Sequence, residues 1–425
     1  MMETINVSEQ LPLQSNSLRV RKAIFFPVLV FLIAMFYNSG PACAAGGNNY
    51  KTIDGKAITT GAERLDQLLP LVKNKNVALL VNQTAIVGNT YLIDTLITSG
   101  VHIKKIFSPE HGFRGTADAG EHVSDSVDAK TGIPVISIYG DKKKPSATDL
   151  AGIDVVIFDI QDVGARFYTF LSTLHYIMEA CAENKVQLVV LDRPNPNGWY
   201  VDGPVLQKKF KSFVGVDPIP VVHGLTIGEY AQMVNGEKWL HDSLQCSLKV
   251  ISCLHYEHKM KFNLPVKPSP NLPNHMAVRL YPSLCFFEGT NVSLGRGTDA
   301  PFQLIGSPET KFDGAYEFVP QSKPGAKNPP FLEQKCYGFD LRLDKNVHQE
   351  GAVSFQYVID MYRLYKNKKE FFLKNNFFDK LTGTDEIRKM IVADKSQSQI
   401  KASYQKGLDA FKAKRKKYLL YKDFE

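Results

Sequence analysis

Short aliphatic runs alternate with amphipathic stretches through the first half of the chain, and this alternation predicts strands separated by helices. The predicted strands are Val77–Val81, His102–Phe107, Pro134–Ile138, Asp154–Ile160 and Val186–Leu191. Between the last two runs, residues 168–184 carry apolar side chains at helical spacing, as at Leu171, Leu174 and Met178. Strands that alternate with helices form a mainly parallel sheet, so the pattern predicts an α/β, Rossmann-like layered domain.

The pattern changes after residue 263, where four prolines between 265 and 273 predict an extended, turn-rich linker. Glycine-rich loops at 288–306 and a proline-rich stretch at 320–330 follow. The helical spacing returns near 351–366, 384–392 and 398–415. We therefore expect a Rossmann-like domain at 48–263 and a smaller α+β C-terminal domain at 264–425.

The N-terminus has the features of an export signal. Three basic residues precede an apolar run at 23–36, and Ala42-Cys43-Ala44 fits the small-x-small cleavage pattern. We expect a signal peptide at 1–44 and an exported protein, periplasmic or extracellular. An uncleaved anchor ranks second, because the run is short for a membrane span. A lipoprotein site at Cys43 ranks third, and no later segment has the length and apolarity of a membrane helix.

Charge and cysteine content narrow the function classes. The formal charge is +8, and a basic cluster at 412–417 reads as a solvated helix face. No nucleic-acid-binding module is recognisable, so we expect no nucleic-acid partner. The five cysteines after Cys43 show no metal-ligand spacing. Cys246 and Cys253 either form a disulfide or remain buried free thiols.

Polar residues follow the predicted strands at their carboxyl ends, which is where α/β sheets place their sites. Asn82 follows the first run, Ser-Pro-Glu-His-Gly follows the second at 108–112, and Tyr139 follows the third. Acids, amides and arginines also follow the fourth and fifth runs, so a site is predicted on one rim of the sheet. A glycine-rich dinucleotide fingerprint and a phosphate loop are absent from the sequence, and we expect no cofactor.

Glu110 is the first catalytic candidate. It follows a strand and Pro109, and it precedes His111 and Arg114. A carboxyl group partly removed from water keeps its proton more readily, and it can then protonate a leaving glycosidic oxygen. An acid that merely pairs with Arg114 explains the same residues equally well at this point.

The second cluster follows the fourth strand and contains Asp159, Gln161, Asp162, Arg166 and Tyr168. A glycosidase needs a second carboxylate as base, nucleophile or cation stabiliser, and either aspartate fits that need. Arg166, or Arg193 after the fifth strand, can hold a substrate carboxylate with two parallel hydrogen bonds. The alternative is a structural Asp–Arg network that ties the strand ends together.

Further candidates come from loops. Asn195 and His223 lie in polar turns, and Thr226-Ile227-Gly228-Glu229 has the spacing of a capping box that opens a helix. In the second region, polar loops at 288–298 are suited to line a cleft. We expect no metal, because His111, Asp159 and Asp192 lack a supporting ligand spacing. The Gly-x-Ser-x-Gly elbow of serine hydrolases is also absent from the sequence.

These motifs together resemble the NamZ-type exo-β-N-acetylmuramidase family of peptidoglycan-recycling glycoside hydrolases. The matching segments run in order from about Gly61 to the C-terminus. They are Ser108–Gly115, Phe158–Thr169, Leu191–Pro196, Glu288–Ser293 with Gly295–Thr298, and Tyr418–Tyr421. One departure is Leu294, where we expect a polar or acidic residue.

The resemblance implies an enzyme that releases N-acetylmuramic acid from the non-reducing ends of peptidoglycan fragments. It implies a Rossmann-like catalytic domain, an ancillary C-terminal domain and an active-site cleft between them. Glu110 takes the position of the family's proposed catalytic residue, with Asp159 or Asp162 assisting. The expected substrate contacts are Asn82, His111, Arg114, Gln161, Arg166, Tyr168, Arg193, Asn195, His223, Glu288, Asn291 and Arg296.

Two other functions fit the same organisation. Exported two-domain α/β proteins often capture solutes without transforming them, so a binding protein for muropeptides or sugars is the first alternative. A metal-assisted cell-wall amidase or esterase is the second alternative. Retaining, inverting and substrate-assisted mechanisms are not distinguished by the sequence, because the choice depends on the separation of two carboxyl groups.

Overall fold

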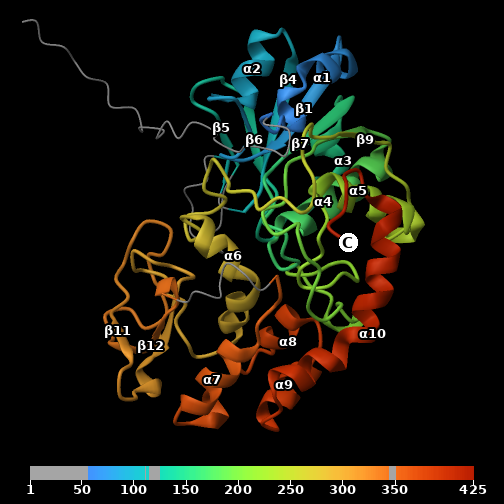
Figure 1. The fold of residues 1–425 in the computed structure, drawn as a ribbon. Helices are drawn as coiled ribbons and strands as arrows, with labels where there is room; N and C mark the ends of the chain where they lie inside the picture. The colour runs from blue at the N-terminus through green and yellow to red at the C-terminus, as the bar shows by residue number, and fades with distance from the viewer. Residues whose placement is uncertain (1–55, 111, 114–124, 344–350) are drawn as a thin grey trace, which may run out of the picture. The chain divides into compact units, whose positions relative to one another are not determined.

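The computed structural model describes residues 56–110, 112–113, 125–343 and 351–425 (Figure 1). The predicted signal peptide at 1–44, with Cys43, and two expected substrate contacts, His111 and Arg114, lie outside these residues. Within the described ranges, no helix is both long enough and apolar enough to cross a membrane.

A seven-stranded sheet with the order β5-β6-β4-β1-β7-β8-β9 forms the centre of the first region. Its strands are β1 (Asn76–Val81), β4 (His102–Ser108), β5 (Ser126–Val127), β6 (Pro134–Ser137), β7 (Val155–Asp159), β8 (Gln187–Leu191) and β9 (Leu248–Ile251). All neighbours pair in parallel except β5 and β6. Without β5, the strands follow the 3-2-1-4-5-6 order of doubly wound folds. The predicted α/β class is confirmed.

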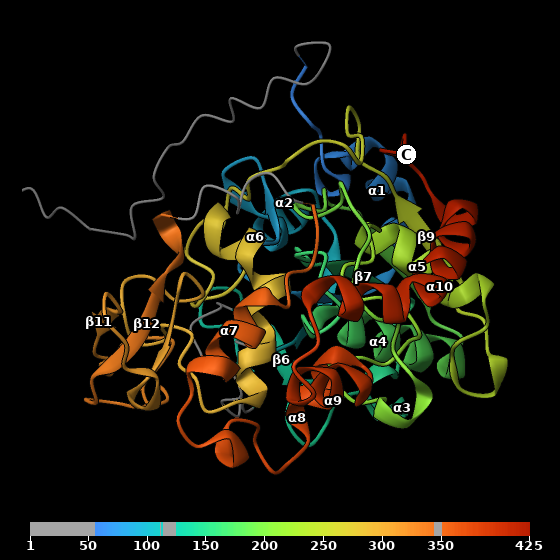
Figure 2. The same cartoon turned by 60° about the horizontal axis from the view of Figure 1, so that its bottom comes forward.

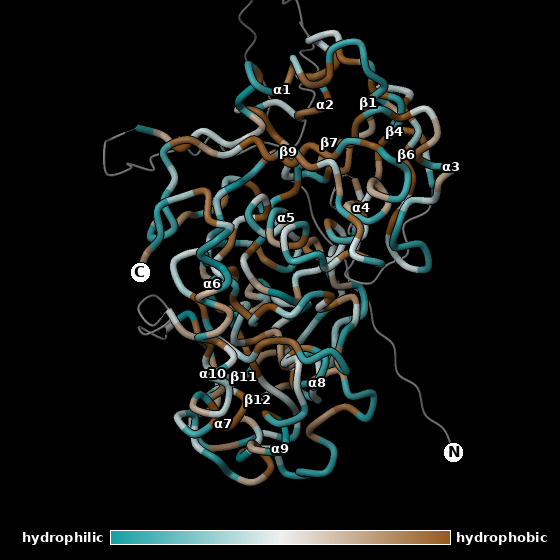
Figure 3. The backbone as a smooth tube through the Cα atoms, turned by 90° about the vertical axis from the view of Figure 1, so that its right-hand side faces the viewer, coloured by the Kyte–Doolittle hydropathy of each residue, from teal (hydrophilic) through white to brown (hydrophobic). Residues whose placement is uncertain are grey.

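Helices cover both faces of this sheet, and the alternation of side chains along each strand explains how. On β1, Val77, Leu79 and Val81 face one core, which also contains residues of α1 (Leu65–Val72) and α2 (Leu92–Thr98). Ala78 and Leu80 face the other core, with α3 (Ala147–Leu150), α4 (Phe170–Asn184) and α5 (Ile227–Gly236). A small hairpin, β2 (Ile86–Val87) and β3 (Thr90–Tyr91), precedes α2. Figure 3 shows hydrophobic stretches along the central strands.

The second region combines helices with a small antiparallel sheet. The sheet has the order β10-β12-β11, from β10 (Leu304–Ser307), β11 (Tyr316–Phe318) and β12 (Cys336–Asp340). The helices are α6 (His275–Leu284), α7 (Gln356–Leu364), α8 (Phe377–Thr382), α9 (Glu386–Val392) and α10 (Gln397–Arg415). The three predicted helices are confirmed as α7, α9 and α10. Residues 264–274 contain neither helix nor strand, as their prolines predict, and the domain boundary near 264 stays a prediction.

The structure also tests two local predictions from the sequence, the capping box of α5 and the pairing of Cys246 with Cys253. The capping box at the start of α5 is present, because Thr226 accepts from the Glu229 N–H and the Glu229 carboxylate accepts from the Thr226 N–H. The five cysteines from Cys181 onward are free and buried, so Cys246 and Cys253 form no disulfide.

The C-terminal tail is anchored to the end of β8. Helix α10 passes α5 in both Figures 1 and 2, and the tail beyond it lies against α5 and β8. The Tyr421 hydroxyl donates to the Asp192 carboxylate at 2.5 Å, and the Thr226 hydroxyl donates to the same oxygen at 2.7 Å. Burial raises the pKa of Asp192 to about 6, although the hydrogen bond from Tyr421 acts in the opposite direction. The Leu420 N–H donates to Glu229 at 2.8 Å. The Tyr-Leu-Leu-Tyr motif therefore fastens the tail.

Arg166 joins the α/β region to the C-terminal helices. Its Nη1 donates to the carbonyls of Pro204 and Ile219, both at 2.8 Å, and its Nη2 donates to the carbonyl of Leu381 in α8 at 2.7 Å. The residue is only 1% exposed, and burial lowers the pKa of its guanidinium, which nevertheless stays charged at neutral pH. This position does not support the prediction that Arg166 holds a substrate carboxylate, because its Nη1 and Nη2 groups donate to buried backbone carbonyls.

We predict that Arg166→Met lowers the free energy of unfolding by about 3 kcal/mol or more, because three buried carbonyl groups lose their donors. Arg363→Met is the matched control. Arg363 is half exposed and pairs with Asp394, so its loss changes the stability by under about 1 kcal/mol. Urea denaturation measures both variants. Equal stability of the two variants would contradict the structural role of Arg166.

We predict that Tyr421→Phe destabilises the protein more at pH 8 than at pH 5. The folded-state pKa of Asp192 is about 6 against an ordinary value of 3.8, so the group favours folding below pH 4 and loses this contribution as the pH rises through 6. At pH 8 the hydroxyl of Tyr421 donates to a full negative charge, which makes a stronger bond than a neutral acceptor.

Tyr418→Phe is the control for that experiment. Its hydroxyl donates to Glu237, and the neighbouring Lys414 and Tyr418 itself outweigh burial and hold the pKa of Glu237 below its usual value. Glu237 is ionised at both pH 5 and pH 8, so the Tyr418→Phe substitution lowers the stability by the same amount at both pH values. Thermal melts of the two variants at pH 5 and pH 8 make the comparison, and a Tyr421→Phe effect that is independent of pH would contradict the account.

Candidate active site

A cavity of about 980 Å³ lies between the strand ends of the α/β region and the loops of the C-terminal region. The α/β side contributes Glu110, Tyr139, Lys143, Thr169 and Phe213. The opposite side contributes Glu288, Arg296, Phe302 and the segment 325–330. This volume is in the range of small-molecule sites, so the cavity is large enough to take a sugar ring and its substituents.

Glu110 is held by two hydroxyl groups. It follows β4, and Tyr139 follows the neighbouring strand β6, which places the two side chains at one edge of the sheet. The Tyr139 hydroxyl donates to Glu110 Oε1 at 2.8 Å, and the Thr169 hydroxyl donates to Oε2 at 2.5 Å. Burial and the charge of Glu110 raise the pKa of Tyr139, so its phenol stays protonated at neutral pH.

A second carboxylate lies in the same cavity and forms an ion pair. Glu288, in a short 3-10 turn after α6, accepts from Arg296 Nη2 at 2.5 Å. Arg296 also lies 5.0 Å from the ring centroid of Phe302. The side chains of Glu288 and Arg296 are 27% and 18% exposed, so both remain open to the cavity. Burial opposes the charge of Arg296, but Glu288 outweighs it and raises the pKa of that guanidinium.

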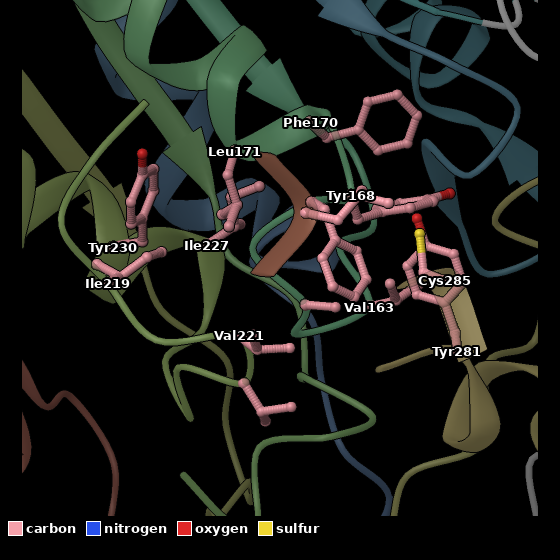
Figure 4. Close-up of a cluster of buried hydrophobic side chains, with 14 of the residues drawn as sticks. Val163, Tyr168, Phe170, Leu171, Ile219, Val221, Ile227, Tyr230, Tyr281 and Cys285 are labelled. Atoms are coloured by element: carbon pink, nitrogen blue, oxygen red, sulfur yellow. The ribbon is translucent and has the colours of Figure 1, made fainter. Parts of the chain in front are cut away.

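Aromatic rings form much of the cavity wall. Tyr168 packs edge-on against Tyr281 at 5.8 Å between ring centroids, and Tyr281 lies 5.1 Å from Phe302. Figure 4 shows Tyr168 and Tyr281 close together, with Cys285 beside them. The Tyr168 hydroxyl donates to the carbonyl of Pro268 and so fixes the proline-rich segment beside the cavity. Such rings offer apolar faces to the C–H groups of a sugar and exclude water from around the carboxyl groups.

Asp159 and Arg193 are not in this cavity. Asp159 is fully buried at the end of β7, and Arg193 donates to it twice, from Nε at 2.5 Å and from Nη2 at 2.8 Å. Burial raises the pKa of Asp159, and the charge of Arg193 opposes that shift. The expectation that Asp159 assists catalysis and that Arg193 binds substrate does not agree with this placement. The structural Asp–Arg network is what the structure contains.

Other predicted contacts hold loops together. Asp162 accepts from the Gly164 N–H at 2.6 Å, and its carboxylate lies 3.7 Å from Nε2 of the buried His223. The amides bond to nearby backbone or loop groups and do not line the cavity; these are Asn82, Gln161, Asn195 and Asn291. Leu294 is also buried outside the cavity, which gives no support to a role in specificity. Of the predicted site residues, the structure brings Glu110, Tyr168, Glu288 and Arg296 together.

Tyr139, Thr169, Lys143 and Phe213 line the cavity but were not among the sequence candidates. Tyr139 had a usable signal, since it directly follows a predicted strand, and Thr169 ends one of the matching motifs. Lys143 and Phe213 lie in loops that carry no motif, so only the fold reveals them. Across the described ranges, no three His, Cys, Asp or Glu side chains gather in a way that could hold a metal ion.

Comparison with known proteins extends over nearly the whole chain. Residues 77–276 match the family described as "Exo-beta-N-acetylmuramidase NamZ, N-terminal", and residues 279–421 match the corresponding C-terminal family. The peptidoglycan β-N-acetylmuramidase NamZ of Bacillus subtilis (strain 168) is 38% identical over 428 residues, which cover 95% of this chain and 100% of that protein.

Two crystal structures of DUF1343-family proteins from Bacteroides fragilis NCTC 9343 have the same fold. The first is 47% identical with a TM-score of 0.80, and it covers 87% of this chain and 100% of its own. The second is 30% identical with a TM-score of 0.74, and it covers 86% and 99%. The fold, the cavity with its two carboxylates and the match along both regions lead to one conclusion: this chain belongs to the NamZ family of exo-β-N-acetylmuramidases.

Proposed function

We propose that this protein is an exo-acting β-N-acetylmuramidase that removes N-acetylmuramic acid from the non-reducing ends of peptidoglycan fragments, with Glu110 as its general acid. The observation that carries the proposal is the carboxyl group of Glu110, which lines a sugar-sized cavity and is held by two hydroxyl groups. The signal-like N-terminus favours export to the compartment that contains this substrate.

The hydroxyl groups suit Glu110 for proton transfer. A hydroxyl can donate to a carboxylate, and after rotation it can accept from a carboxylic acid. Tyr139 and Thr169 therefore hold Glu110 in one orientation in both protonation states. In the reaction, Glu110 gives its proton to the glycosidic oxygen as the bond to the anomeric carbon breaks, and the leaving sugar departs as a neutral alcohol. Water supplies the new bond to the anomeric carbon of the released sugar and gives up a proton, which restores the acid form of the site.

Glu288 is the second carboxylate of this mechanism, in place of Asp159 and Asp162. It lines the same cavity and is partly open to it, whereas the two aspartates are bound into buried contacts. Glu288 forms an ion pair with Arg296, and its carboxylate is placed to stabilise the oxocarbenium-like transition state.

The two alternative functions make different demands on this site. A sugar-binding protein can use the same aromatic walls and carboxyl groups to hold the ring, but it releases no free sugar. An amidase or esterase of the metal-assisted kind yields free peptide or acyl products instead of free sugar, and chelation removes its activity. Analysis of the products therefore distinguishes a muramidase from a sugar-binding protein and from an amidase or esterase.

We predict that Glu110→Gln keeps the fold but lowers kcat on a muramic-acid glycoside by about two to four orders of magnitude, because an amide cannot deliver the proton. Glu317→Gln is the matched control. Glu317 is exposed on β11 and pairs with Lys335, so the same chemical change leaves kcat unaltered. Near wild-type turnover by Glu110→Gln would show that Glu110 is structural.

We predict that Glu288→Gln lowers kcat by about two to three orders of magnitude, the range for loss of one electrostatic stabiliser, with little change in melting temperature. Asp159→Asn gives the opposite pattern, because it leaves Arg193 buried without its counter-charge and so lowers the melting temperature first. Steady-state kinetics and thermal melts of both variants test the assignment. Unchanged kcat in Glu288→Gln would remove Glu288 from the mechanism.

A further inference from the structure

We propose that Lys143 is the residue that binds the carboxylate carried by the substrate's sugar ring, and that it thereby sets the preference for muramic acid. This inference rests on the proposed muramidase function and adds to it the group that recognises the lactyl substituent. N-acetylmuramic acid differs from N-acetylglucosamine by that substituent, so a selective site needs a cation where the carboxylate lies.

Lys143 is placed for this role by the wall that also carries Glu110. Its Nζ lies 5.1 Å from the ring centroid of Phe213, and that ring lies 5.9 Å from the ring of Tyr139, which hydrogen-bonds to Glu110. All four residues line the cavity. The cation and the proposed acid therefore lie on one side of the space that the sugar would occupy.

The ring beneath Lys143 is itself held in place. Phe213 sits in a tight turn closed by two hydrogen bonds between Ser212 and Gly215. The Ser172 hydroxyl of α4 donates to the Phe213 carbonyl at 2.7 Å, and the Tyr176 ring stacks nearly parallel to the Phe213 ring. A fixed aromatic face restricts the ammonium group through cation–π attraction without neutralising its charge. The charge remains available to an incoming anion.

The arginines first considered for this role have other partners. Arg166 serves three carbonyl groups, Arg193 serves Asp159, and Arg296 serves Glu288. In contrast, Lys143 forms no ion pair with any carboxylate in the described ranges. Lys327, from the C-terminal region, also lines the cavity and is the rival cation for this role.

The test is a substrate–variant cycle. The wild type and Lys143→Met are assayed with a chromogenic β-glycoside of N-acetylmuramic acid and with the same glycoside methyl-esterified on the lactyl group. We expect the wild type to prefer the acid, and Lys143→Met to lower kcat/KM on the acid roughly tenfold, mainly through KM, as for a charged hydrogen bond in a partly open site. The kcat/KM on the ester changes little, so the preference for the acid disappears. Lys143→Arg retains that preference.

Controls separate this inference from its alternatives. Lys142→Met removes the neighbouring lysine, which pairs with Asp149 outside the cavity, and it leaves the preference intact. Equal effects of Lys143→Met on acid and ester, a wild type without preference, or loss of preference in Lys327→Met instead would overturn the role of Lys143. These results would leave the muramidase function standing. If the wild type hydrolyses neither glycoside, the proposed function fails, and the role of Lys143 fails with it.

Discussion

The hydrogen bonds of Arg166 are the contact on which the geometry of the cavity depends. One buried guanidinium serves Pro204 and Ile219, at the two ends of a loop, and Leu381 in α8. The loop carries Phe213 and α8 carries Phe377, and both side chains line the cavity. A single residue of the α/β region therefore fixes elements from both walls. Breaking any of these three hydrogen bonds would leave a buried carbonyl group without its donor, and this cost holds the arrangement in place.

The carboxyl groups around the sheet and the cavity fall into two groups with different physical roles. Asp159, Asp192 and Glu229 are buried and fully engaged, the first with Arg193 and the others with capping and tail groups. They tie the sheet to its loops and to the C-terminal tail. Glu110 and Glu288 are held by neighbours but remain open to the cavity. Chemistry requires this second state, because a group that is wholly enclosed by its own protein has no access to a substrate.

This distinction explains which parts of the structure could be predicted from sequence. The strand β7 and the helix α4 follow from the period of their apolar residues, and the α5 capping box follows from Thr226 and Glu229, because those signals are local. The strand-end rule also brought Glu110 to the correct edge of the sheet. The rule could not tell Arg193 from Arg296, since both are arginines in polar loops. Which of them meets solvent is decided by packing against distant residues, such as Asp159 and Glu288. Lys143 and Phe213 were unpredictable for the same reason.

The most direct test of the account is the identity of the released product. Purified protein is incubated with two defined peptidoglycan disaccharides, one with N-acetylmuramic acid at its non-reducing end and one with N-acetylglucosamine there, with and without a chelator. The account predicts that free N-acetylmuramic acid appears from the first disaccharide alone and that chelation leaves the rate unchanged. Binding of the first disaccharide without release of sugar would contradict it.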